Sequence, residues 1–125
     1  MSIYFESKPS ILISMESAEL PEVWQEVLFG IEEEGIPYKL LNESNTDDVI
    51  SRAYSAAQTS ALAVGIACTS NKMVIHHKNL PEQQPLFNME ASALTDKLAL
   101  RDLGNNAARL IKGIPFKQES HQLGE

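Results

Sequence analysis

Three adjacent carboxylates, Glu32, Glu33 and Glu34, are the side chains of this sequence that could do chemistry most directly. They end an apolar-periodic stretch and so crowd the position where a helix dipole is negative, where each costs roughly 0.3–1 kcal/mol. The stretch contains no basic residue that would offset them. Hard divalent cations prefer oxygen ligands. We therefore consider two interpretations: a cation or basic partner surface lies against this cluster, or the cluster is an acidic helix end in water.

The other reactive side chains give no self-contained active site. His76 and His77 are adjacent on a predicted strand, so they point to opposite faces, and we expect one ring inside and one in water. Cys68 lies in the most apolar stretch, where a thiol is usually inert. The sequence has no glycine-rich phosphate loop, no paired-cysteine motif and no nucleophile elbow. The residues alone therefore predict a binding or regulatory subunit rather than an enzyme.

Composition limits the class further. A length of 125 residues is typical of one domain, so we expect one over 1–125, with 1–9 and 117–125 as loose termini. The net charge of −7 argues against nucleic acid or an anionic membrane as partner and suits a basic protein. With one cysteine and no signal peptide the chain is expected in the cytoplasm. No apolar run approaches the ~20 residues that span a bilayer.

The acidic cluster is positioned by an amphipathic helix predicted over Leu20–Gly35, with Pro21 in its first turn and Gly35 at its end. Apolar segments flank it at Ser10–Met15 and Ile36–Leu41. Strand, helix and strand in this order indicate a βαβ unit with parallel strands.

The following segments predict a second helix and a hairpin. The helix is capped by Thr46 or Asp47 and runs to about Ser60. The nearly all-apolar run Ala61–Thr69 is typical of a central strand covered on both faces. A turn at Ser70 and Asn71 leads to an antiparallel partner over Lys72–Lys78.

The last third predicts a loop and two helices. Asn79–Asn88 has two prolines and no period, and its Leu80 and Phe87 either plug the core or form a contact patch. Met89–Leu103 has helical spacing, Gly104 interrupts it, and Asn105–Lys112 is a further helix capped by Asn105. The fold class is therefore α/β: a three-layer-like domain with a mostly parallel sheet and one antiparallel hairpin strand.

Three stretches resemble a known family. Val23–Tyr38 (VWQEVLFGIEEEGIPY), Val64–Phe87 and Gly104–Phe116 (GNNAARLIKGIPF) are similar to the small subunit of diol and glycerol dehydratase reactivases, over about half the chain and in the same order. The resemblance implies a flavodoxin-like layer, also seen in anticodon-binding domains. It does not distinguish glycerol from 1,2-propanediol as the substrate of the target enzyme.

The resemblance also implies partners and a mechanism. The partner would be a large subunit with an actin-like ATPase domain that binds ATP or ADP. The complex would contain two copies of each subunit. Its ATP hydrolysis would release damaged cobalamin from an adenosylcobalamin-dependent dehydratase. The small subunit would be non-catalytic, bind no cofactor alone and exchange with a dehydratase subunit. Association with a bacterial microcompartment stays open.

Residue by residue, the resemblance places Glu33 at a divalent cation, Mg²⁺, on the interface with the large subunit, with Glu32 and Glu34 as alternatives. Other interface candidates come from the distinctive strings: Asn79, Leu80, Phe87, Asn105 and Arg109. Arg109 would bridge to an acid of the partner or to a local glutamate. Two other classes stay open: a medium-type structural subunit of the dehydratase itself, and a small free-standing α/β enzyme or regulatory binding module.

Overall fold

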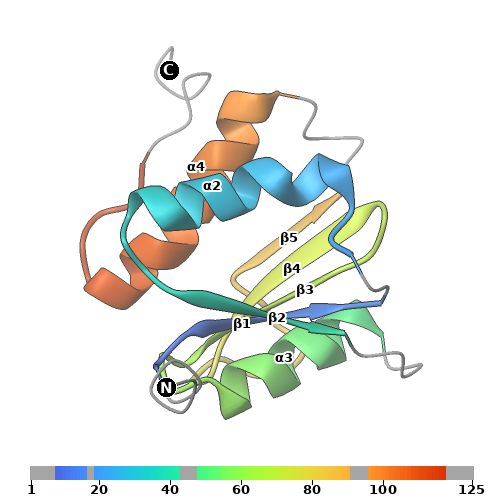
Figure 1. Cartoon of the computed structure of the whole chain (residues 1–125). Helices are drawn as coiled ribbons and strands as arrows, with labels where there is room; N and C mark the ends of the chain where they lie inside the picture. The colour runs from blue at the N-terminus through green and yellow to red at the C-terminus, as the bar shows by residue number, and fades with distance from the viewer. Residues whose placement is uncertain (1–7, 17–18, 43–47, 91–95, 118–125) are drawn as a thin grey trace, which may run out of the picture.

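Three layers make up the computed structural model, which describes residues 8–16, 19–42, 48–90 and 96–117 (Figure 1). A five-stranded sheet is the middle layer, helices α2 and α4 cover one face, and helix α3 covers the other. The main apolar core lies between the sheet and the α2–α4 pair, and a smaller one lies under α3. In the described part of the chain, no helix is both long and apolar enough to cross a membrane.

The sheet has the strand order β2-β1-β3-β4-β5. Its strands are β1 (Ile11–Met15), β2 (Tyr38–Asn42), β3 (Val64–Cys68), β4 (Lys72–His77) and β5 (Phe87–Glu90). β1 pairs in parallel with β2 and β3, as the βαβ pattern predicts. β4 is antiparallel to β3, which confirms the hairpin.

The expectation of a mostly parallel sheet is wrong, because β5 adds a second antiparallel pairing and makes the sheet mixed. The strand order matches that of flavodoxin-like sheets, in which however all strands are parallel. A short turn can join only antiparallel neighbours, and β3 and β4 are separated by three residues.

β5 was not expected, since its residues fall at the end of the predicted loop and the start of the predicted helix. Phe87 and Met89 alternate with Asn88 and Glu90, and the first two pack against the main core. The prediction of a helix over Met89–Leu103 is therefore wrong at its start. Residues 91–95 lie outside the described ranges.

The amphipathic helix is confirmed. It opens with a 3₁₀ turn, η1 (Glu22–Trp24), and continues as α2 (Gln25–Glu33). Gly35 ends it with φ +78°, a left-handed conformation that glycine adopts at low cost. Trp24 is fully buried and its indole N–H donates to the Thr69 carbonyl at 2.7 Å, so the helix start is tied to the β3–β4 turn.

Helix α3 (Val49–Thr59) is capped by Asp48, whose carboxylate accepts from the Ser51 N–H at 2.9 Å. The expected caps Thr46 and Asp47 are one or two residues too early. Its inner face carries small residues, and Ala53 and Ala57 are buried against the sheet. Any side chain at Gly65 would collide with the backbone of this helix.

Arg52 of α3 is only 3% exposed, although it is charged. Its guanidinium donates to the carbonyl of Ser14 at 3.1 Å and to the carbonyl of Cys68 at 3.1 Å. It thus joins the carboxyl ends of β1 and β3. Among the described residues no carboxylate pairs with it.

Helix α4 (Lys97–Lys112) is continuous, so the expected break at Gly104 and the Asn105 cap are wrong. Asp96 is the cap, accepting from the Leu98 N–H at 2.9 Å. Gly104 and Gly30 lie where α4 crosses α2, and a side chain at either would collide with the other helix's backbone. The glycine serves close packing rather than helix termination, which Gly113 provides with φ +70°.

Candidate functional site

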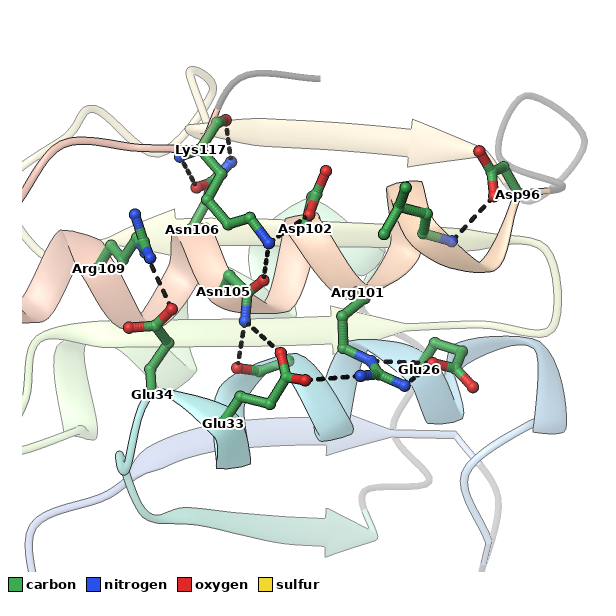
Figure 2. Close-up of polar contacts among 12 residues, drawn as sticks. Glu26, Glu33, Glu34, Asp96, Arg101, Asp102, Asn105, Asn106, Arg109 and Lys117 are labelled. Atoms are coloured by element: carbon green, nitrogen blue, oxygen red, sulfur yellow. Dashed lines mark hydrogen bonds and ion pairs between the residues drawn. The ribbon is translucent and has the colours of Figure 1, made fainter. Parts of the chain in front are cut away.

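The Glu33 carboxylate lies at the junction of α2 and α4, held by two residues of α4 (Figure 2). Its Oε2 accepts from the Arg101 guanidinium at 2.7 Å, and its Oε1 accepts from the Asn105 side-chain amide at 3.1 Å. These two hydrogen bonds, that from Asn105 first, lower the pKa of Glu33. The lowered pKa favours the ionised carboxylate, and the two hydrogen bonds orient it. The side chain is nevertheless 50% exposed, so the carboxylate is accessible.

Arg101 connects Glu33 to a second acid. Its Nε and NH2 donate to Glu26 Oε1 at 3.0 and 2.6 Å. Its guanidinium lies over the Phe29 ring, 5.5 Å from the centroid, within the range of a cation–π contact. The arginine is therefore fixed between the two glutamates.

Lys117 lies at the other end of the same group. Its ammonium donates to Asn105 Oδ1 at 3.0 Å. It is also 3.0 Å from Asp102 Oδ1, an ion pair whose atoms are not aligned as a hydrogen bond. Lys117, the first residue of the terminus expected over 117–125, is thus held by contacts to α4, and the remaining residues lie outside the described ranges.

We call Glu26, Arg101, Glu33, Asn105, Lys117 and Asp102 the Glu33 network. It contains three carboxylates and two cations, which leaves one net negative charge. The side chains of Glu26 and Asp102 are 18% and 9% exposed, against 50% for Glu33. Glu33 is therefore where the excess charge reaches solvent.

The neighbouring acids are held differently. Glu34 is 11% exposed and pairs with Arg109 at 2.9 Å and Lys112 at 2.8 Å. Its pKa is lowered, chiefly by the hydrogen bond from Lys112. Glu32 accepts from the Tyr38 hydroxyl at 2.7 Å. Burial, and next the bond to Glu32, raise the pKa of Tyr38 to about 12.

The crowded carboxylates are thus compensated within the chain, which the helix sequence alone did not indicate. Arg109, one of the interface candidates, pairs with a local glutamate. Asn105 is 1% exposed and lies between the helices, where its amide also donates to the Gly30 carbonyl at 2.8 Å. Its side chain is linked to the surface through Glu33 and Lys117, which are 50% and 37% exposed.

The remaining candidates lie apart from this network or at its margin. The backbone N–H groups of Asn79 and Leu80 donate to His77, at its Nδ1 and its carbonyl. Phe87 is half-buried in β5, with its ring centroid 5.9 Å from that of Phe116, the residue before Lys117. Their roles toward a partner stay predictions.

The expected burial of one histidine and of the cysteine is confirmed. His76 is fully buried, with Nε2 2.9 Å from the Glu82 carbonyl, whereas His77 is only partly covered. Cys68 is 1% exposed, and burial raises its pKa to about 11. Within the ranges that the structure describes, no three His, Cys, Asp or Glu side chains are grouped so that they could hold a metal ion.

Sequence reasoning missed Arg101 and Lys117. One signal was present: Arg101, Asn105 and Arg109 follow one another at spacings of four, so they share one face of a continuous helix. The predicted break at Gly104 separated Arg101 from the other two. Lys117 carries no comparable signal.

Comparison with known proteins assigns this chain to a family. The family model described as the dehydratase medium subunit matches residues 8–117. The chain belongs to the dehydratase medium subunit family. All residues of the Glu33 network fall within the part of the chain that this family shares.

Two relatives of this chain are small subunits of reactivating factors. The propanediol dehydratase-reactivating factor small subunit of Citrobacter freundii is 50% identical over 110 residues, 88% of this chain and 91% of the relative. The protein of the same name from Salmonella typhimurium is 48% identical, covering 89% and 92%.

Two solved structures share the fold. A structure of diol dehydratase-reactivating factor complexed with ADP and Mg²⁺ contains a chain 46% identical to this one, with a TM-score of 0.80, covering 90% of this chain and 100% of that one. A glycerol dehydratase reactivase matches with a TM-score of 0.80 at 26% identity, covering 89% and 98%.

Proposed function

We propose that this chain is the non-catalytic small subunit of an ATP-dependent reactivase for an adenosylcobalamin-dependent diol or glycerol dehydratase. The observation that carries the proposal is 48–50% identity to reactivating-factor small subunits over almost the whole of both chains. The residues agree with it, since no motif for phosphate binding or nucleophilic catalysis is present in the sequence.

In this proposal the chain works with a large subunit that binds ATP and ADP, two copies of each, in the cytoplasm or a microcompartment. ATP hydrolysis there drives release of damaged cobalamin from the dehydratase. The small subunit leaves its partner, and a dehydratase subunit of the same fold takes its place. Exchange of this kind requires two interfaces whose free energies differ by only a few kcal/mol.

Glu33 is the proposed contact to a divalent cation, Mg²⁺, at the interface with the large subunit. The chain itself could supply only part of such a site, because no three ligating side chains are grouped in its described ranges. Glu33 suits the role better than Glu34, because its side chain is 50% exposed against 11% and one cation holds it rather than two. The remaining ligands would come from the partner.

Reactivation tests the proposal. A glycerol-inactivated or cyanocobalamin-blocked dehydratase is mixed with ATP, Mg²⁺, fresh adenosylcobalamin and the large subunit, with and without this chain. Recovery of activity only when the chain is present is the expected result. No recovery, with both subunits folded and drawn from one source, would contradict it.

A second candidate is a structural subunit of the dehydratase itself, which the description of the family model favours. Equilibrium dialysis of the chain with adenosylcobalamin distinguishes the two. A dehydratase subunit that contributes to the cofactor site would retain cobalamin, whereas the proposed reactivase subunit would not.

A further inference from the structure

Lys117 is fixed on α4 by hydrogen bonds between its backbone and the side chain of Asn106. The Lys117 N–H donates to Asn106 Oδ1 at 2.7 Å, and the Asn106 amide donates to the Lys117 carbonyl at 3.3 Å. Asn106 thus satisfies both backbone groups of Lys117, as a neighbouring strand would. These bonds set the place of Lys117 without involving its ammonium, which is left to act elsewhere.

That ammonium bonds to the acceptor end of the Asn105 amide, while the donor end bonds to Glu33 and Gly30 (Figure 2). An asparagine amide has one oxygen acceptor and one NH₂ donor. A cation on the oxygen therefore favours the orientation in which the NH₂ group faces the Glu33 carboxylate. Because Asn105 is 1% exposed, water does not readily replace Lys117 in this arrangement.

We propose that Lys117 is a positioning residue for Glu33, acting through Asn105 to hold the carboxylate in the orientation that meets the partner's cation. This inference rests on the proposed function of Glu33. Asp102 offsets the charge of Lys117, so the effect is on orientation more than on net charge. Lys117 then contributes to partner binding through the orientation of Glu33.

A double-mutant cycle between Lys117 and Glu33 tests the proposal. The full chain is titrated with the large subunit in Mg²⁺ buffer, and dissociation constants are measured for Lys117→Met, Glu33→Gln and the double variant. Lys117→Met should weaken association about tenfold, as is typical when a residue supporting a metal ligand is lost. In the Glu33→Gln background it should have almost no further effect.

Controls separate positioning from stability and from charge. Lys97→Met removes the same charge from the exposed start of α4 and should leave association unchanged. Lys117→Arg, which can still donate to Asn105, should recover most of the affinity. The Asn105 side-chain amide signals in the NMR spectrum of the isolated chain should shift in Lys117→Met and not in Lys97→Met.

Three outcomes would overturn the inference. Equal weakening by Lys117→Met in both backgrounds would show that Lys117 acts independently of Glu33. Shifted Asn105 signals with unchanged association would show that the contact exists but does not serve the interface. If Glu33→Gln itself leaves association unchanged, the cation role of Glu33 fails and this inference fails with it, while reactivation still tests the subunit assignment separately.

Discussion

Gly104 of α4 faces the backbone of α2 so closely that a β-carbon on it would lie 3.1 Å from the Gly30 Cα and collide with the Val27 carbonyl. The close crossing brings Arg101 and Asn105 within hydrogen-bond distance of Glu33. The two glycines therefore set the geometry of the Glu33 network as well as the packing of the helices.

Gly104→Ala should lower the free energy of unfolding by about 1–3 kcal/mol, as overpacking does. In an uncrowded helix interior the same change would instead raise the free energy of unfolding by up to about 1 kcal/mol. The sign of the change therefore shows whether the two helices cross closely at Gly104. Urea unfolding followed by circular dichroism measures it. Ser55→Ala on the exposed face of α3 is the control, and a rise in stability for Gly104→Ala would contradict the close crossing.

Arg52→Lys should destabilise the chain by about 1–3 kcal/mol, although it keeps the charge. A lysine ammonium lacks the planar fork that reaches the carbonyls of Ser14 and Cys68 together, and it leaves a buried cation poorly bonded. Arg52→Met, unlike Arg52→Lys, removes the buried charge and should lower the free energy of unfolding by less. The free energies of unfolding of the wild type, Arg52→Lys and Arg52→Met test this prediction. A free energy of unfolding for Arg52→Lys close to that of the wild type would contradict it.

Glu33→Gln should weaken association with the large subunit about tenfold or more in Mg²⁺ buffer, since a charged cation ligand is lost. The isolated chain should stay folded, because an ion pair with this much exposure contributes little to stability. Isothermal titration measures the affinity, with Glu22→Gln, an exposed glutamate at the start of the same helix, as the matched control. Unchanged affinity in magnesium buffer would contradict the assignment of Glu33 as a cation ligand.

Glu34 should make the stability of the chain depend on pH. Lys112, and after it Arg109, lower its pKa in the folded state below the ordinary 4.5, against the opposing effect of burial. The ionised form then stabilises the fold above 4.5, and this contribution is lost as the pH falls through the lowered pKa. The stability difference between wild type and Glu34→Gln should shrink on acidification, and a difference independent of pH would refute it.

Much of the first half of the fold could be predicted because its signals are local. Pro21, the apolar period and Gly35 define one helix, and an apolar run followed by Ser70 and Asn71 defines the hairpin. The cap of α3 was misplaced by one or two residues because consecutive polar side chains at Thr46, Asp47 and Asp48 offer similar caps.

The second half depends on tertiary contacts that no local pattern contains. Gly104 indicates a break by propensity, yet here it permits a helix crossing whose other member, Gly30, is 74 residues earlier. β5 has four residues and is completed only by pairing with β4. The same limit applies to the site, since the cations that hold Glu33 and Glu34 come from α4, 68 to 78 residues away.

Cys68, the one cysteine of the sequence, has a practical consequence because it is buried and its pKa is raised to about 11. The thiolate is the nucleophile that attacks labelling reagents, so the native thiol should react slowly while β3 stays covered. A cysteine introduced at an exposed position such as Lys97 could carry a fluorophore without any need to remove the natural one. The proposed exchange of the chain between its partner and a dehydratase could then be followed in real time by energy transfer.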